Sequence, residues 1–522
     1  MLHPGRNTTY LISYSKSNIS FSLMKCIVLF GAGKSATVLI DYLKQLATKK
    51  NWHVVVADSD LKTTQQKTGR HPLVKAVQLN IEKDQQRREL VQQAHVVISL
   101  MPPDLHYLIA LDCILFHKHL LTASYIDDKI KKLKEDIEHR SLLFLCEMGL
   151  DPGIDHMSAM RLIHAIEAKG GEITSFKSHC GGLVAPESDN NPWHYKISWN
   201  PRNVVTAGKA GAVYKEENKE IQASYNDLFG NNKTVHIPKL GTYAYYPNRD
   251  SLSYQSLYNL EAAHTFIRTT LRHPDYCFGW KNIIDLKLTD DEKKYQTDAM
   301  SIADFFKIHF ERNGFDQWLN DMLMSRLSFA KDLMLQLTQL IETEENAKAI
   351  DEHSSDFLVV DEKGELNSVI IDEVKDKAAE TVADKMHEAN LTLKQLFALG
   401  LDDNDTIINK GLCSAADVLQ FILEKKLLLQ PADKDMVVML HEIEYTLNGK
   451  PAKQRSALVV KGKDNVHTAM AKTVGLPLGI AAKLILEGKI KETGLHIPVI
   501  PSIYEPVLEA LKAHDISFYE EE

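Results

Sequence analysis

Several ionisable side chains crowd around a Pro-Gly turn in residues 145–157, LCEMGLDPGIDHM. They are Glu147, Asp151, Asp155 and His156, which could ligate a metal, exchange protons or begin a helix. A metal site is disfavoured because no second, separated set of ligands accompanies these residues. We therefore expect no bound metal at this turn.

Asp155 stands directly before a run of apolar residues with helical spacing. Met157, Met160, Ile163 and Ile166 recur at that spacing until Gly170 and Gly171 interrupt it. This pattern predicts a helix that ends before the glycines, with Asp155 as its N-cap.

A glycine-containing turn near the start of the chain predicts a nucleotide site. In LFGAGKSA, Gly31, Gly33 and Ala36 fit the G-x-G-x-x-G/A fingerprint: a tight turn, close approach of a pyrophosphate, and close helix–strand packing. The turn follows an apolar run and opens a segment with helical spacing, which is the context that the fingerprint requires. We expect the loop residues Gly31, Ala32, Gly33, Lys34 and Ser35 to bind a dinucleotide.

Two further residues belong to the expected cofactor site. Asp58 ends the second expected strand, 25 residues after Gly33, where an acid accepts hydrogen bonds from a ribose and repels a 2'-phosphate. We therefore expect NAD as the cofactor, with NADP as the alternative. The competing interpretation, which we disfavour, is that Asp58 only caps the next helix. Ser99 ends the fourth expected strand and should lie beside the cofactor.

The elements around these residues alternate between strands and helices. Apolar runs at 26–30, 52–58, 76–81, 94–102 and 118–125 are separated by helix-length stretches. This alternation predicts an α/β fold with a doubly wound parallel sheet of the Rossmann type. Further along the chain, runs at 435–449 and 455–462 flank Asn448-Gly449 and predict an antiparallel strand pair, and 470–490 predicts a buried helix.

Bulk properties limit the remaining possibilities. A chain of 522 residues favours two to four domains, and a net charge of -9 argues against a nucleic-acid partner. The six cysteines form no CxxC pair, which indicates a reducing compartment, and no apolar run suggests a membrane span. We expect a cytoplasmic protein, with the mitochondrial matrix as the alternative, and a disordered extension over residues 1–23 before Met24.

Several motifs together resemble one enzyme family. The segments VISLMP, TASYI, GLDPGIDHM, CGGLVAPE, NNPWHYKISW, YPNRDS, TLRHPDY and MAKTVGLPLGIAAKLILEGKI occur in that order. Over residues 24 to about 280 and 410 to 522 the chain resembles saccharopine dehydrogenase of the glutamate-forming type. HCGGLV replaces the family's more usual Tyr-Cys-Gly-Gly-Leu-Pro, and VADSD stands where fungal NADP-using relatives carry an arginine, which agrees with the argument from Asp58.

The resemblance implies a reaction and a domain plan. The reaction is oxidation of saccharopine with NAD(P) and water to glutamate and 2-aminoadipate 6-semialdehyde, or the reverse condensation, in lysine metabolism. The plan is a Rossmann domain at 24–125 completed by about 467–522, an α/β substrate domain at 126–284 with 430–466, and a charged, solvated helical subdomain at 285–429. A related oxidoreductase on another imine or aldehyde and a non-catalytic dinucleotide-binding regulator are the alternatives, and a homodimer is compatible with the sequence.

The resemblance also implies roles for individual residues. Ser124, Tyr125, Asp151 and Arg249 are matched to the substrate site, together with Thr270, Leu271 and Arg272, and Leu150 and Pro152 are matched to the cofactor site. Asp151 and Tyr125 are the expected catalytic pair, and His179 is a further candidate proton carrier. Arg202 is a weaker substrate candidate, and Cys180 is expected to be a packed thiol because imine hydrolysis needs no nucleophilic thiol.

Overall fold

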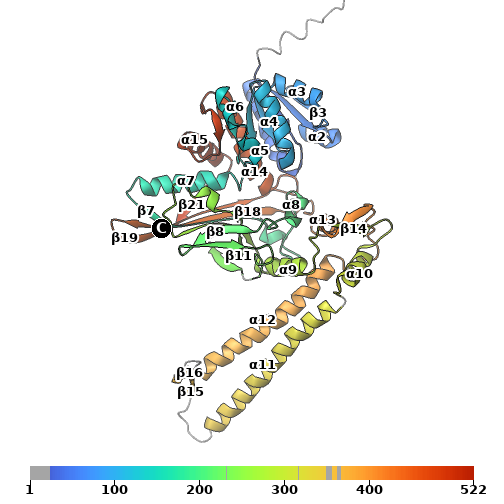
Figure 1. Ribbon diagram of the computed structural model, residues 1–522, viewed down its shortest axis with the longest axis vertical. Coiled ribbons are helices and arrows are strands. Elements are labelled where there is room, and N and C mark those ends of the chain that lie inside the picture. Colours follow the sequence, from blue (N-terminus) through green and yellow to red (C-terminus); the bar gives the residue numbers. More distant parts are fainter. Residues whose placement is uncertain (1–23, 231, 316, 349–355, 361–365, 522) are drawn as a thin grey trace, which may run out of the picture. The chain divides into compact units, whose positions relative to one another are not determined.

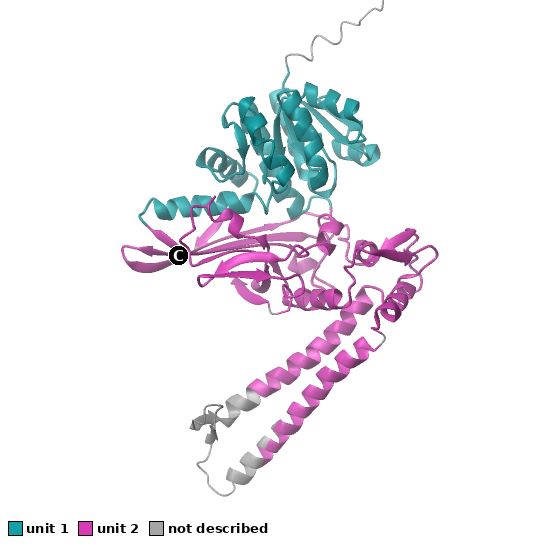
Figure 2. Ribbon diagram, viewed as in Figure 1, with its two compact units in different colours: residues 1–170, 466–517 teal, residues 171–465, 518–522 magenta. Residues whose placement is uncertain are grey.

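The computed structural model describes residues 24–521 except 231, 316, 349–355 and 361–365, so the expected extension at 1–23 lies outside the described residues. The chain divides into two compact units (Figure 2). Unit 1 runs to Gly170 and resumes from Val466 to Ser517, and unit 2 comprises Gly171–Asn465 and Phe518–Glu522.

Unit 1 is built on a seven-stranded sheet in which every pair is parallel, in the order β20-β6-β5-β4-β1-β2-β3. All five residues of β1 are buried, as expected for a strand that is covered on both faces. The strands are β1 (Cys26–Phe30), β2 (His53–Asp58), β3 (Val74–Gln78), β4 (Val96–Ser99), β5 (His119–Thr122), β6 (Leu143–Leu145) and β20 (Gly494–His496). The predicted doubly wound fold is confirmed.

The helices of unit 1 pack around this sheet, most of them on its two faces (Figure 1). They are α1 (Thr37–Lys50), α2 (Leu61–Thr68), α3 (Asp84–Gln93), α4 (His106–Leu115), α5 (Asp128–Lys131), α6 (Lys134–His139), α7 (Ile154–Glu167), α14 (Ala469–Leu486) and α15 (Pro501–Lys512). Helix α14 lies against α1 so closely that a Cβ on Gly475 would be 2.9 Å from the Cβ of Leu39. The C-terminal segment therefore belongs to the same compact unit as the parallel sheet.

The first expected domain boundary, at residue 125, lies too early. Strand β6 extends the parallel sheet beside β5, and α7 packs against α15, so unit 1 continues to Gly170. Helix α7 covers the predicted span and ends before Gly170. Its apolar residues Met157, Met160, Ile163 and Ile166 are all buried.

Unit 2 contains a ten-stranded mixed sheet whose main path is β10-β11-β13-β7-β18-β19-β21. Its strands are β7 (Glu172–Val184), β8 (Ala212–Glu216), β9 (Lys219–Ala223), β10 (Lys233–Ile237), β11 (Gly241–Pro247), β12 (Arg249–Asp250), β13 (Thr265–Arg272), β18 (Asp435–Leu447), β19 (Lys450–Lys461) and β21 (Tyr519–Glu521). Strands β18 and β19 are the predicted antiparallel pair, with Asn448 and Gly449 at positive φ in the turn.

The helices of unit 2 are α8 (Pro201–Val205), α9 (Pro274–Asp285), α10 (Ile302–Asn313), α11 (Trp318–Lys348), α12 (Ile371–Ala398) and α13 (Ala415–Lys426). Two small sheets accompany them: β14 (Lys293–Gln296) with β17 (Leu412–Ser414), and β15 (Asp356–Val360) with β16 (Leu366–Ile370). Helices α11 and α12 run side by side as a long hairpin (Figure 1).

The segment 285–429 is not a uniformly solvated subdomain. Phe305 and Phe306 of α10 and Leu419 of α13 are buried in the same apolar cluster as Trp193 and Trp280. The apolar faces of these two helices therefore join the core of unit 2, whereas the α11–α12 hairpin projects from it (Figure 1).

One helix of the described chain, α14, is long and apolar enough by composition to cross a membrane. It is 67% buried inside the protein, as the core helix of a folded domain would be. The sequence predicts a buried helix at 470–490, and Lys472 and Lys483 interrupt its apolar run.

Candidate active site

The glycine turn after β1 has the geometry of a phosphate-binding loop. Gly31 has a φ of 100°, and a Cβ there would lie 2.8 Å from the carbonyl oxygen of Leu100, so only glycine fits. A Cβ on Gly33 would meet no atom within 4 Å, which leaves open space where a pyrophosphate would approach. Ala36 is buried, as close helix–strand packing requires. These residues fit a bound dinucleotide.

Asp58 fastens this loop from the end of β2. Its Oδ2 accepts a hydrogen bond of 2.7 Å from the backbone N–H of Ala32, and its Oδ1 accepts one of 3.0 Å from Asp60. The reading that Asp58 caps the next helix is wrong, because Asp60 is the N-cap of α2 and accepts from the N–H of Thr63. Asp58 thus places its charge beside the loop.

Lys67, in α2, contacts the same loop and was missed in the sequence. Its Nζ donates to the carbonyl oxygens of Ala32 at 2.7 Å and Gly33 at 2.6 Å. Burial lowers the pKa of Lys67, an effect that the nearby carboxylates of Asp58 and Asp41 partly oppose. The carboxylate of Asp58 and the ammonium of Lys67 therefore both hydrogen-bond to the backbone of this loop.

His106 links a residue matched to the cofactor with one matched to the substrate. Its Nδ1 lies 2.7 Å from the hydroxyl of Ser99, and its Nε2 lies 2.8 Å from that of Ser124 and 3.3 Å from that of Thr122. Burial lowers the pKa of His106 to about 4, so the ring is neutral near pH 7. The sequence reading missed this residue, which begins α4 seven positions after Ser99.

Tyr125 and Asp151 meet at the ends of neighbouring strands. The Tyr125 hydroxyl donates to Oδ1 of Asp151 at 3.3 Å, and both side chains are half-buried. The backbone N–H of Met148 bonds to the carbonyl of Thr122 at 3.0 Å, which ties the two segments together. The structure therefore brings the expected catalytic pair together.

The turn itself is fixed by glycine and by buried atoms. A Cβ on Gly153, whose φ is 147°, would lie 2.1 Å from the carbonyl oxygen of Gly149. Leu150 is 5% exposed and Pro152 is buried, and their assignment to the cofactor stays a prediction.

Glu147 and His156 form a buried pair next to this turn. Oε2 of Glu147 lies 2.9 Å from Nε2 of His156, and Oε1 of Glu147 accepts from the backbone N–H of Ile126 at 3.2 Å. Glu147 and His156 therefore hold the residue that follows Tyr125. Asp155 is not the N-cap, which is Gly153; it lies in the first turn of α7 and accepts the Gly153 N–H at 2.6 Å, where the helix dipole favours an anion.

The other substrate candidates belong to unit 2. Thr270 pairs with Tyr246 of β11 and with Cys180 of β7, while the side chain of Leu271 is fully buried. Arg272 is 4% exposed, donates to the carbonyl of Leu271 at 2.8 Å, and lies over the rings of Tyr195 and Tyr276. Its Nε has no hydrogen-bond partner among the described residues. A buried guanidinium with a spare donor suits a carboxylate ligand.

Arg249 stands at the start of β12 with a φ of 52° and an exposed side chain. The register aligns it with Ala212 of β8. Its role in substrate binding stays a prediction.

Three weaker candidates have structural roles. His179 is buried, with Nδ1 2.7 Å from the Thr269 hydroxyl and Nε2 3.3 Å from Glu442, so both ring nitrogens have partners within the sheet. Arg202 pairs with Asp291 at 2.6 Å and Asp417 at 3.1 Å, as a surface arginine would. Cys180 is buried, as expected for a packed thiol.

A parallel Rossmann sheet with a glycine loop after its first strand defines the class of dinucleotide-binding proteins, and the Tyr125–Asp151 pair lies at the carboxyl ends of its strands. Two family descriptions match nearly the whole chain: the saccharopine dehydrogenase NADP binding domain over residues 27–144 and the saccharopine dehydrogenase C-terminal domain over residues 149–516. The chain belongs to the saccharopine dehydrogenase family.

Individual relatives agree with this assignment. Alpha-aminoadipic semialdehyde synthase of Arabidopsis thaliana is 31% identical over 95% of this chain and 44% of its own length. Saccharopine dehydrogenase [NADP(+), L-glutamate-forming] of Saccharomyces cerevisiae is 29% identical over 94% of this chain and 97% of its own. The apo structure of the L-Glu-forming enzyme from that yeast superposes with a TM-score of 0.73 at 27% identity, covering 95% and 99% of the two chains.

The chain spans about half the length of the first of these relatives and of the mammalian synthases that it also matches, such as that of Bos taurus at 31% identity and 48% of its length. The yeast enzyme, by contrast, is matched over almost its whole length.

Proposed function

We propose that this chain oxidises L-saccharopine with water to L-glutamate and 2-aminoadipate 6-semialdehyde, or runs the reverse reductive condensation, in lysine metabolism. The observation that carries the proposal is the Tyr125–Asp151 pair, at 3.3 Å, at the carboxyl edge of a dinucleotide-binding sheet. Membership of the family and the printed names of the yeast relatives support the same reaction.

The chemistry assigns roles to the residues of this chain. A bound nicotinamide dinucleotide would accept a hydride from the substrate carbon that carries the secondary amine, which leaves a C=N bond on the substrate. Asp151 accepts a proton from the water that adds to this bond, and Tyr125, hydrogen-bonded to Asp151, returns a proton to the departing amine. The C–N bond breaks, glutamate leaves as the amine, and the added oxygen becomes the aldehyde of the second product.

The neutral ring of His106 holds the hydroxyl of Ser124 next to Tyr125. Because it carries no charge near pH 7, it fixes the orientation of the two serine hydroxyls without adding a cation to the site.

Turnover of saccharopine tests the proposal. Purified protein mixed with L-saccharopine and either NAD or NADP should produce reduced cofactor and glutamate in equal amounts. The absence of both products with either cofactor would refute the saccharopine reaction, and turnover of a different amino-acid-derived imine or aldehyde would then identify the related oxidoreductase.

For the cofactor, we propose NAD as the preferred form. The yeast relatives carry NADP(+) in their names, which favours NADP in those proteins. In this chain the carboxylate of Asp58 ends β2 beside the phosphate loop, where it would repel a 2'-phosphate. Asp58→Asn retains an oxygen for the N–H of Ala32 and removes the charge.

We expect Asp58→Asn to raise the ratio of kcat/KM for NADP to that for NAD by about tenfold, equivalent to about 1.4 kcal/mol. Steady-state kinetics with both cofactors measures the ratio, and Asp60→Asn, which alters the neighbouring cap instead, is the matched control. An unchanged ratio in Asp58→Asn would remove Asp58 from the choice of cofactor.

A further inference from the structure

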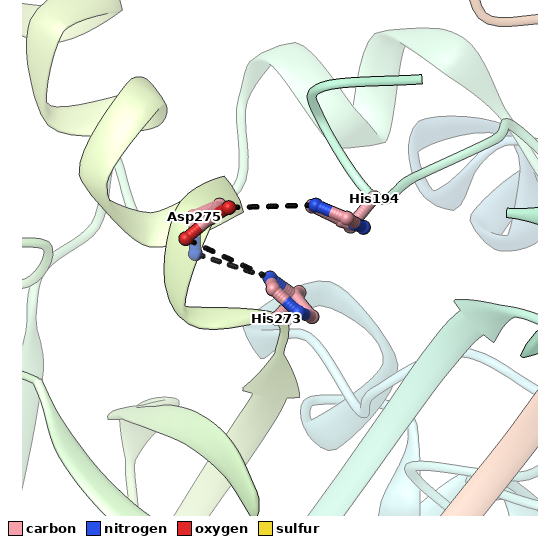
Figure 3. Close-up of side chains that lie close together, drawn as sticks. All are labelled: His194, His273 and Asp275. Atoms are coloured by element: carbon pink, nitrogen blue, oxygen red, sulfur yellow. Dashed lines mark hydrogen bonds and ion pairs between the residues drawn. The ribbon is translucent and has the colours of Figure 1, made fainter. Parts of the chain in front are cut away.

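Three imidazoles converge on one carboxylate at the start of α9 in unit 2. Nε2 of His194 lies 3.4 Å from Oδ2 of Asp275, while Nδ1 of His273 and Nε2 of His387 lie 4.0 and 3.7 Å from Oδ1. Figure 3 shows His194 and His273 both directed at Asp275. One ligand atom from each of these three residues can be chosen so that all lie within 4.8 Å of one another.

These separations are long for direct charge-assisted hydrogen bonds, which are usually about 2.7–2.9 Å. They suit donors that share an ion, because two ligands each about 2.1 Å from a tetrahedral centre lie about 3.4 Å apart. The separation between His194 and Asp275 has this value.

The surroundings of His194 orient it as a ligand. Its Nδ1 donates to Oδ2 of Asp189 at 2.6 Å, which leaves Nε2 directed at Asp275. A carboxylate behind a histidine in this way is the usual outer support of a metal-binding imidazole. Oδ1 of Asp189 is buried with no hydrogen-bond partner among the described residues. This oxygen can therefore accept a further hydrogen bond or bind a cation.

The cluster is preformed and reachable from solvent. The rings of His194 and His273 stack with centroids 3.9 Å apart, and Nδ1 of His273 accepts the backbone N–H of Asp275, a bond that metal coordination at this nitrogen would replace. The side chains of His194, His273 and Asp275 are 31%, 35% and 20% exposed. Asp189 and His194 also line a pocket of about 650 Å³ that includes Lys394.

We propose that His194, His273 and Asp275 form a binding site for a first-row divalent transition metal, with Zn²⁺ as the ion of choice and His387 as an additional ligand. Imidazole nitrogens favour Zn²⁺ over Mg²⁺ or Ca²⁺, which prefer oxygen donors. The ion would cross-link the loop that carries His194, the start of α9 and helix α12. All of these ligands belong to unit 2.

Calorimetric titration of the tag-free, chelator-treated full chain with Zn²⁺ tests the site. We expect one ion per chain with a Kd of about 1 μM or below, equivalent to about -8 kcal/mol. His194→Gln and Asp275→Asn should each raise the Kd about tenfold or more, and His387→Ala by less because its side chain is 60% exposed. His236→Ala, at an exposed histidine in β10, is the matched control.

Asp275→Asn keeps the size of the side chain, and its melting temperature without Zn²⁺ shows whether the variant is folded. At the same Zn²⁺ concentration, the melting temperature of the parent protein should rise by more than that of Asp275→Asn. No stoichiometric binding by the parent, or equal affinity in the parent, His194→Gln and Asp275→Asn, would overturn the proposal. Saccharopine turnover in the presence of chelator is measured separately, so failure of the metal site leaves the proposed reaction untouched.

Discussion

At the scale of single residues, the phenol of Tyr125 and the carboxylate of Asp151 form the proton-transfer pair of the proposed reaction. Tyr125→Phe and Asp151→Asn preserve shape and remove one proton carrier each. We expect kcat for saccharopine oxidation to fall by about 10²-fold or more in each variant, with a smaller change in KM, since general acid–base catalysis contributes about 10²–10⁴-fold.

Steady-state assays with saturating NAD and saccharopine check this prediction. Tyr107→Phe, in α4, removes a phenol that has no part in the pair and should leave kcat unchanged. A kcat for Asp151→Asn within twofold of the parent value would contradict the assignment.

The lowered pKa of His106 leads us to predict that the stability of the protein depends on pH. Its pKa is about 4 in the folded protein and about 6.5 when unfolded, so between these values the unfolded chain binds the additional proton. Stability is therefore lost as the pH falls from 6.5 to 4, by up to about 3 kcal/mol from this residue.

We expect His106→Asn to reduce the difference in the free energy of unfolding between pH 7 and pH 4 by up to that amount, although its lost hydrogen bonds lower stability at pH 7. Urea unfolding at the two pH values measures the difference. The exposed, positive-φ residue His117, changed to Asn, is the control and should retain the full dependence. An identical dependence in His106→Asn would show that the ring is not a buried neutral group.

At the scale of elements, substitutions at the two glycines of the phosphate loop distinguish an effect on protein stability from an effect on cofactor binding. Gly31→Ala places a methyl group 2.8 Å from the Leu100 carbonyl at a φ of 100°, and should destabilise the protein by about 2 kcal/mol or more. Gly33→Ala meets open space, so it should change stability by no more than about 0.5 kcal/mol.

The same Gly33→Ala methyl occupies the space of the pyrophosphate, and we expect it to raise the Kd of the dinucleotide at least about tenfold. Urea unfolding and fluorescence titration of the reduced cofactor measure the two effects. Unaltered cofactor affinity in Gly33→Ala would mean that the phosphates do not lie on this loop.

At the scale of the whole molecule, the α11–α12 hairpin exposes many large apolar side chains. Phe329, Met334 and Leu335 of α11 are 49%, 54% and 54% exposed, whereas Ala330 is 3% exposed. Because the exposed residues bury little area in the single chain, changing all three to Gln should alter the free energy of unfolding by less than about 1 kcal/mol. If the chain forms the homodimer with which its sequence is compatible, this exposed apolar surface is where we predict the contact.

Urea unfolding of the triple variant checks its stability, and sedimentation velocity compares its association with that of the parent. The matched control is Ala330→Gln, which forces a larger polar side chain into the packed side of the same helix and should destabilise by more than 1 kcal/mol (the usual range is about 1–3 kcal/mol). A large loss of stability in the triple variant would show that these side chains are packed in solution.

Much of the fold could be predicted because its signals are local. Apolar runs separated by helix-length segments define the parallel strands, and the alternation fixes the doubly wound class. The boundary at residue 125 was wrong for a non-local reason: β6 is only three residues long, and its place in the sheet depends on pairing with β5 and with the distant β20.

The sequence by itself determined the phosphate loop, the family and the GLDP turn, because each is a contiguous motif whose chemistry follows from residue types and spacing. Only the tertiary structure decided that Glu147 and His156 form a buried pair under the turn, that His106 joins Ser99 to Ser124, and that Asp275 gathers His194, His273 and His387. These groupings join residues through folding rather than through motif spacing. A histidine's function depends on which donors and acceptors surround it, and that surrounding is set by how strands and helices pack.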